Sequence, residues 1–293
     1  MDPYHYIKEG EKGAWLSIIT YLLLATFKLT MAYVGNSSAL RADGLNNATD
    51  VIASIAVLIG LKISRKPPDD DHHYGHFRAE MIASLIAAFI MMTIGIQVLI
   101  NTVQIFINND FQQPDMLTAW TALVCAIIMF AVYFYNLQLG NRINSSAIKA
   151  VAQDNKSDAL VSIGAFVGIM GAQFQLYWLD PLAGLIVGII ICITAWHIFR
   201  DATHTLTDGF QPKKVKKIRK SIEQNPNVLG IKDVKGRLHG NQALVDITIL
   251  VDPHLTVKES HKIADHIEKK LSEDHGIPHA QIHIEPFEED SKD

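Results

Sequence analysis

Apolar residues dominate the first two thirds of the 293-residue chain and gather in six long stretches. A helix needs about 20 apolar residues to cross a bilayer. Stretches such as 82–100 and 182–196 are apolar on nearly every side, unlike the two-faced helices of soluble proteins. The pattern therefore predicts an α-helical membrane protein with six transmembrane helices. The expected spans are residues 14–34, 40–63, 79–107, 116–139, 147–172 and 181–206.

The pattern changes after Asp208, where Gln211-Pro212 interrupts the helical periodicity. Apolar residues then recur at helical spacing within 212–222 and alternate with polar ones in 243–249, as in a half-buried strand. Helical spacing and strand-like alternation each appear again further along the chain. We therefore expect the order helix, strand, strand, helix, strand. We expect a membrane domain of residues 1–208 and a smaller α+β domain of residues 209–293.

The distribution of Lys and Arg in the short connections predicts how the chain is oriented in the membrane. Lys62, Arg65, Lys66 and Arg78 flank the second connection, whereas 35–38, 108–115 and 173–180 contain no Lys or Arg. Connections rich in Lys and Arg stay on the cytoplasmic side, so both termini should be cytoplasmic. The amino terminus lacks the short apolar region and small-residue cleavage site of a signal peptide and should be uncleaved.

Overall composition, with 49% hydrophobic residues and a net charge of −4, argues against nucleic acid as a partner. Cys125 and Cys192 both lie in apolar stretches, so a disulfide framework or a thiolate zinc site is not expected. The chain also lacks a phosphate-binding glycine loop and a nucleophile paired with a base. These features speak against an enzyme and against a bound prosthetic group.

Two pairs of oxygen-bearing side chains interrupt the apolar stretches: Asn46 with Asp50, and Asp154 with Asp158. Residues four apart share one helix face, so each pair points in one direction. A carboxylate at the bilayer centre costs about 2.5 to 3.5 kcal/mol, and ionisable groups there mark ion pathways by default. Satisfied polar groups or helix caps are the alternative, which suits Asp43 and Asn47 better. The two pairs predict a cage for a hard divalent ion such as Mn²⁺ or Mg²⁺.

Two further clusters offer metal ligands outside the spans. Asp69, His72 and His76 follow Pro67-Pro68 in the second connection, and could bind a metal or form a solvated acidic loop. In the carboxy-terminal domain His283 and Glu285 share a strand face that a helix bearing His261 could approach. Ordinary surface histidines are the alternative there.

The chain resembles the cation diffusion facilitator family from about the first span to Pro286. The resemblance rests on residues 42–50, 67–80 and 154–158. It implies a homodimer of six-helix protomers in the cell membrane, with a metallochaperone-like, ferredoxin-like cytoplasmic domain. It also implies export of divalent metal ions in exchange for protons, and a charge interlock between Arg78 and Asp208.

Departures from the zinc-exporting pattern of that family indicate the cargo. Those members commonly carry Asp or His at the position of Asn46 and His at the position of Asp154. Lys232 and Thr248 likewise stand where zinc exporters have histidine ligands. The set Asn46, Asp50, Asp154 and Asp158 resembles the manganese-exporting branch. Export of zinc, iron, cobalt or cadmium is the alternative, and a membrane metal sensor without transport is a second one.

Overall fold

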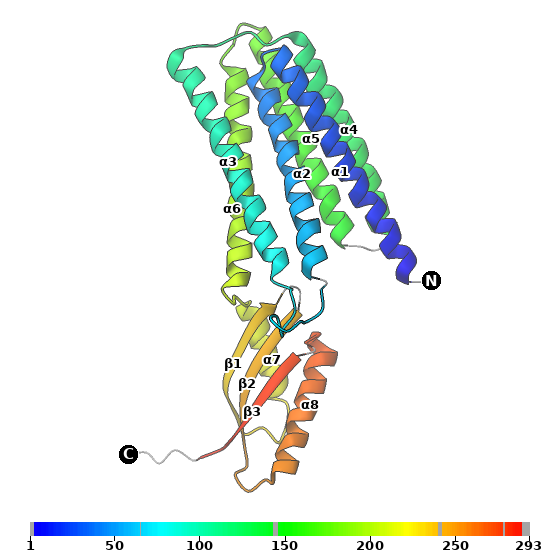
Figure 1. The fold of residues 1–293 in the computed structure, drawn as a ribbon, viewed down its shortest axis with the longest axis vertical. Coiled ribbons are helices and arrows are strands. Elements are labelled where there is room, and N and C mark those ends of the chain that lie inside the picture. Colours follow the sequence, from blue (N-terminus) through cyan, green and yellow to red (C-terminus); the bar gives the residue numbers. More distant parts are fainter. Residues whose placement is uncertain (1–2, 65, 143–145, 240–241, 278, 289–293) are drawn as a thin grey trace. The chain divides into compact units, whose positions relative to one another are not determined.

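The structure is a computed structural model that describes residues 3–64, 66–142, 146–239, 242–277 and 279–288. The outer limits of the two expected domains, residues 1 and 293, lie outside the described residues. Six long helices come first, followed by a helix, two strands, a helix and a strand (Figure 1). The long helices are α1 (Pro3–Val34), α2 (Ser38–Ser64), α3 (Ala79–Asn108), α4 (Met116–Arg142), α5 (Ser146–Gln173) and α6 (Leu179–Leu206).

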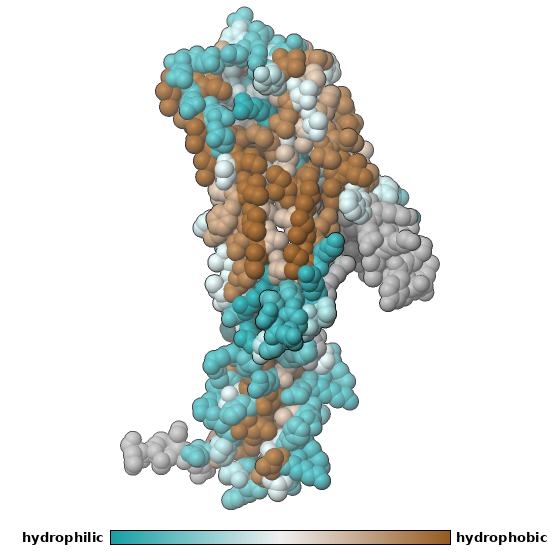
Figure 2. Space-filling view, in the orientation of Figure 1, coloured by the Kyte–Doolittle hydropathy of each residue, from teal (hydrophilic) through white to brown (hydrophobic). Residues whose placement is uncertain are grey.

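The long helices match the expected spans closely, except that α1 begins at Pro3 rather than near residue 14. Among the described residues, α2, α3, α4, α6 and the Trp15–Val34 part of α1 are long and apolar enough to cross a membrane. Figure 2 shows apolar side chains covering much of the surface of the long helices. Helix α5 has the length but carries Lys149, Asp154, Lys156 and Asp158, which lower its hydropathy. Its crossing remains a prediction.

The chain forms two compact units. The first comprises the residues up to Leu58 together with Ile86–Phe199, and the second comprises Ile59–Leu85 together with the residues from Arg200 onward. This division differs from the expected boundary at residues 208 and 209, because the ends of α2, α3 and α6 group with the carboxy-terminal part. The expected boundary therefore stays a proposal.

Within the first unit, α4 packs along α5, and α1 contacts both. Helices α3 and α6 approach each other closely at Gly95, where an added Cβ would lie 2.6 Å from the Cys192 sulfur. Helix α6 meets the start of α2 at Asp180, whose carboxylate accepts hydrogen bonds from the Ser37 hydroxyl (2.6 Å) and the Ser38 N–H (2.7 Å). Asp180 thus satisfies backbone donors that the first turn of α2 would otherwise leave unpaired.

The carboxy-terminal domain has the predicted order: α7 (Pro212–Ile222), β1 (Gly230–His239), β2 (Gln242–Val251), α8 (Val257–His275) and β3 (His279–Pro286). Strand β2 is central, antiparallel to β1 and parallel to β3. Its alternate residues Val245, Ile247 and Ile249 are buried, together with apolar residues of α7 and α8. The two helices therefore share one core with the sheet, as the alternating pattern predicts.

Candidate metal centre

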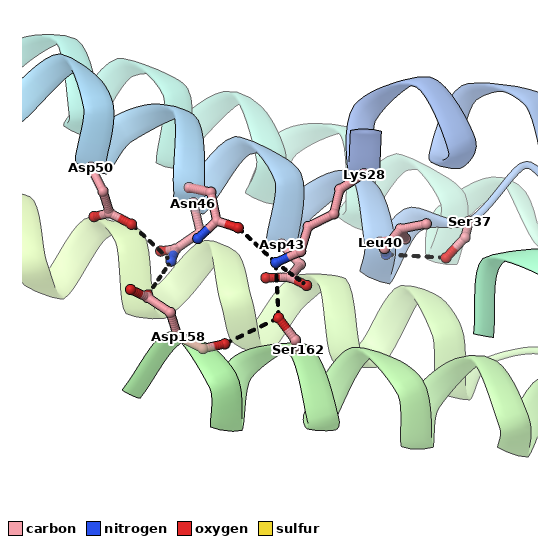
Figure 3. A network of polar contacts seen from close by, with 9 residues as sticks. Lys28, Ser37, Leu40, Asp43, Asn46, Asp50, Asp158 and Ser162 are labelled. Atoms are coloured by element: carbon pink, nitrogen blue, oxygen red, sulfur yellow. Dashed lines mark hydrogen bonds and ion pairs between the residues drawn. The ribbon is translucent and has the colours of Figure 1, made fainter. Parts of the chain in front are cut away.

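Asn46 joins two carboxylates from different helices inside the first unit. Its Nδ2 donates to Asp158 Oδ1 at 2.9 Å and lies 3.5 Å from Asp50 Oδ2 (Figure 3). Asn46 and Asp158 are buried, and Asp50 is half-buried. Helix periodicity places Asn46 and Asp50 on one face of α2, which meets the face of α5 that carries Asp158. Asn46 and Asp50 thus converge with Asp158, which lies 112 positions after Asn46 in the sequence.

Asp154, the fourth expected ligand, lies one turn before Asp158 on α5 and is more exposed. It lines the same cavity of about 530 Å³ as Asn46, Asp50 and Asp158. The hydrogen bonds of Asn46 reach Asp50 and Asp158, whereas Asp154 shares the cavity with these three side chains.

A chain of buried polar groups continues from Asp158, and the sequence analysis did not single it out. The Tyr21 hydroxyl of α1 donates to Asp158 Oδ2 at 2.7 Å and accepts from Asn155 Nδ2 at 2.8 Å. Asn136 of α4 and Ser17 of α1 then donate to Asn155 Oδ1, at 2.9 and 3.2 Å. This network thus links the Asp158 carboxylate on α5 to side chains of α1 and α4. The available signal was Ser17 and Tyr21, four residues apart on the first apolar helix.

Lys156 lies between the two α5 carboxylates in sequence but not in space. Its Nζ lies 6.0 Å from the centre of the Tyr133 ring on α4, within reach of a cation–π contact. Helix periodicity also places residue 156, two positions from each carboxylate, off the face shared by Asp154 and Asp158.

The second connection brings its three expected ligands together. Asp69 Oδ1 lies 3.0 Å from His72 Nδ1, and Asp69 Oδ2 lies 3.3 Å from His76 Nε2. Among the described residues, this is the one group of three His, Cys, Asp or Glu side chains whose ligand atoms all lie within 4.8 Å of one another. The hydrogen bond from the His72 ring lowers the pKa of the Asp69 carboxyl below its ordinary value. The cluster has the donors and spacing of a surface metal site.

The three expected ligands of the carboxy-terminal domain do not form one cluster. His261 on α8 lies 3.6 Å from Asp265, whereas His283 and Glu285 on β3 lie 3.8 Å apart. The Lys232 ammonium also binds Glu285 Oε2, at 2.6 Å. Lys232 therefore places a positive charge beside Glu285. Zinc exporters of the family that the chain resembles have a histidine ligand at the position of Lys232. Arg78 and Asp208, expected as a charge interlock, do form an ion pair of 2.7 Å.

Carboxylates that face a cavity inside a bundle of apolar helices are typical of an ion-handling membrane protein. Comparison with known proteins supports the same class. Residues 14–207 match the family described as the cation efflux transmembrane domain, and residues 210–287 match the cation efflux protein cytoplasmic domain. The chain therefore belongs to the cation efflux family, and it is a multi-pass membrane transporter of divalent metal ions rather than an enzyme.

Several curated relatives match nearly the whole chain. The manganese efflux system protein MneS of Bacillus subtilis (strain 168) is 49% identical over 289 residues, covering 99% of this chain and all of MneS. The uncharacterized transporter YdbO of the same strain is 48% identical over 286 residues, 98% of this chain and 99% of YdbO. The manganese efflux system protein MneP is 32% identical over 291 residues, 96% of this chain and 97% of MneP.

Proposed function

We propose that this protein exports Mn²⁺ from the cytoplasm in exchange for protons, by alternating access to a cage of Asn46, Asp50, Asp154 and Asp158. The observation that carries the proposal is the contact of Asn46 with Asp158 and Asp50 inside one cavity. Two relatives that cover the chain are named manganese efflux proteins. An oxygen-only ligand set also favours a hard ion such as Mn²⁺ over zinc, which usually recruits imidazole or thiolate.

Each cage residue has a distinct role in this proposal. Asp50 and Asp158 hold the ion from two helices, and Asp154 adds charge and proton coupling. Asn46 contributes a neutral oxygen once its amide rotates, because its Oδ1 is the only atom of that side chain that can bind a cation. Protons replace the ion when the cage empties, since several carboxylates in a low dielectric cannot all stay ionised without a cation.

The proposed arrangement in the membrane is six spans with both termini on the cytoplasmic side, and a domain boundary between residues 208 and 209. A homodimer is supported by the dimer-type cytoplasmic domain that residues 210–287 match. In this orientation the amino end of α1 faces the cytoplasm, as does the connection with Asp69, His72 and His76. We infer that this connection binds a metal ion on the cytoplasmic side.

Energetics set a condition on the exchange. Moving a divalent ion outward against 100 mV costs about 4.6 kcal/mol, because each elementary charge is worth about 2.3 kcal/mol. One returning proton recovers half of that amount. A single proton per metal therefore requires a pH gradient or a metal gradient in addition.

Asp50→Ala and Asp158→Ala test the cage. In proteoliposomes with a Mn²⁺-sensitive dye in the lumen, we expect either change to reduce Mn²⁺ uptake by on the order of 100-fold or more. Loss of an outer-shell partner alone weakens metal binding by about 10- to 100-fold, and these residues are direct ligands. Asp274→Ala, at an exposed position of α8, is the matched control and should transport normally. Uptake retained in either cage variant would refute the site.

Asp154→His tests the choice of cargo. Imidazole suits zinc better than the carboxylate does, so we expect the ratio of zinc to manganese transport to rise by about tenfold, a difference of about 1.4 kcal/mol. Parallel uptake assays with Zn²⁺ and Mn²⁺ give the ratio. An unchanged ratio would contradict the argument from ligand hardness. Mn²⁺ that binds the parent protein without crossing the membrane would instead identify a sensor.

A further inference from the structure

An ion pair lies fully buried among the long helices, beside the cage. Lys28 Nζ of α1 contacts Asp43 Oδ2 of α2 at 2.9 Å, and both side chains are 0% exposed. The same nitrogen donates to Asn47 Oδ1 at 2.6 Å and to Ser162 Oγ of α5 at 2.8 Å (Figure 3). An ammonium has three N–H donors, so these contacts use all of them. Lys28 thus ties three helices together and has no donor left for another partner.

This cluster lies one helical turn from the cage on both ligand-bearing helices. Asp43 precedes Asn46 by three residues on α2, and Ser162 follows Asp158 by four residues on α5. The Ser162 hydroxyl donates to the carbonyl oxygen of Asp158 at 3.1 Å. Lys28 is therefore connected to the backbone of a cage residue through a single side chain.

The cage is open toward the amino end of α1 and closed toward the carboxyl end of α1. Its cavity extends from Asn46 and Asp158 toward the amino end of α1, along Ser17, Ser54 and Val151. Toward the carboxyl end of α1, the Lys28–Asp43 pair comes first. Beyond it lies a tightly packed apolar cluster whose buried members are Ala32, Ala39, Leu40, Ala119, Ala122, Ala165 and Ile169.

We propose that the Lys28–Asp43 pair, held by Asn47 and Ser162, is the gate that closes the cage toward the carboxyl end of α1. This inference rests on the proposed transport function and identifies gating residues for it. Cargo can leave on that side only if α1, α2 and α5 separate there, and separation of α1 from α2 breaks the pair. An ammonium in the exit path also repels a divalent cation.

The chemistry of the pair suits a two-state gate. Two opposite charges attract strongly in a dry interior, but water that enters an opening gap raises the local dielectric and solvates both charges. The dry, closed state is therefore stabilised by the attraction between the charges, and the open state by the water that solvates them. In addition, Asp43 Oδ1 and Asn47 Nδ2 have no hydrogen-bond partner among the described residues, so hydration on opening satisfies atoms that closure leaves unpaired.

A purely structural role makes a different prediction. If the pair only holds helices together, replacing both charges with neutral groups of similar size leaves a packed, closed interface. If the pair is the gate, the same double change makes the protein open more often toward the carboxyl end of α1. The test therefore uses Lys28→Met combined with Asp43→Asn, which leaves no uncompensated buried charge.

Thiol labelling measures the opening directly. The reporter is Ala165→Cys, a 0% exposed position of α5 in the apolar cluster, with Cys125→Ala and Cys192→Ala removing the native thiols. The full-length protein in right-side-out vesicles is treated with a membrane-impermeant maleimide. We expect the double variant to be labelled at least about tenfold faster than the parent reporter, as the closed population falls. Ser162→Ala, which removes one of three acceptors, should raise the rate by a smaller factor.

A control variant removes an exposed pair instead. Lys235→Met with Asp233→Asn deletes an ion pair of 2.8 Å on β1 and should leave the labelling rate unchanged. Unchanged labelling in both the double variant and Ser162→Ala, while each still binds Mn²⁺ by calorimetry, would overturn the gate. Mn²⁺ binding that survives Asp50→Ala would overturn the cage instead. Labelling does not depend on which ion is carried, so the two failures are distinguishable.

Discussion

At the scale of single residues, the site depends on side chains whose partners are distant in sequence. Asn46 and Asp50 could be paired from their spacing on one helix, but the contact from Asn46 to Asp158 spans 112 positions. Tyr21 was not predicted at all, because a tyrosine in an apolar run is ordinarily a packing residue. Lys28 and Asp43 could be recognised as costly charges among apolar residues, but their pairing depends on how α1 and α2 meet.

Tyr21→Phe tests whether the polar network orients the cage. The change removes the hydroxyl that donates to Asp158 and accepts from Asn155, and nothing else. We expect the apparent affinity for Mn²⁺ to fall by about 10- to 100-fold, as for other outer-shell partners of metal ligands. Uptake assays over a range of Mn²⁺ concentrations give the apparent affinity.

Tyr33→Phe is the matched control for this change, since Tyr33 lies on the same helix and is 87% exposed. It should behave like the parent protein. Equal affinities in the parent and Tyr21→Phe would mean that Asp158 holds its orientation without the network.

At the scale of elements, local signals predicted most of the boundaries. The six long apolar stretches appear as α1–α6, and the change of period after Asp208 appears as the α7, β1, β2, α8, β3 order. Helix α8 has a capping box, in which Thr256 Oγ1 accepts from the Glu259 N–H and Glu259 accepts from the Thr256 N–H. The extension of α1 to Pro3 was not predicted, because residues 3–13 are too polar to count as a span.

Thr256→Ala should loosen the start of α8. The Thr256 hydroxyl and backbone N–H both bond to the Glu259 carboxylate and lower its pKa below the ordinary value. A lowered pKa in the folded state stabilises the cap above the ordinary glutamate range, and the stabilisation is lost as pH falls through the lowered pKa. We expect faster amide exchange at the start of α8 in Thr256→Ala at neutral pH, measured by mass spectrometry on the full chain.

In the parent protein, acidification should lower the protection factor at the start of α8, which is the intrinsic exchange rate divided by the measured rate at the same pH, and the protection factor of Thr256→Ala should respond less to acid. Thr207→Ala, an exposed threonine outside α8, serves as the control. Identical pH responses in the parent and Thr256→Ala would rule out the capping box as the source of this stability.

At the scale of the whole molecule, the proposed exchange of Mn²⁺ for protons requires that metal and protons compete for one set of carboxylates. Metal binding to carboxylates displaces their protons, so the apparent affinity for Mn²⁺ should decrease as pH falls. The cavity opens from the cage toward the amino end of α1, which is the side from which the proposed orientation lets cytoplasmic metal enter. The Lys28–Asp43 pair stands on the opposite side.

A pH gradient tests this competition. Proteoliposomes whose lumen is about one pH unit more acidic than the medium gain about 1.4 kcal/mol for each proton that leaves. We expect faster Mn²⁺ uptake under this gradient, and alkalinisation of the lumen when Mn²⁺ is added. A pH-sensitive dye in the lumen records the second effect. Mn²⁺ uptake without any change in lumenal pH would exclude proton exchange.

The sequence by itself determined the helices, the strands and the chemical type of the proposed ligands, because these follow from local periodicity and from the cost of charge in an apolar setting. Asn46, Asp50, Asp154 and Asp158 were all identifiable in this way. Only the tertiary structure decided that Asn46 contacts Asp158, that Tyr21 donates a hydrogen bond to Asp158, and that Lys232 forms an ion pair with Glu285. Contacts between side chains of separate elements depend on how those elements pack, which no local pattern contains.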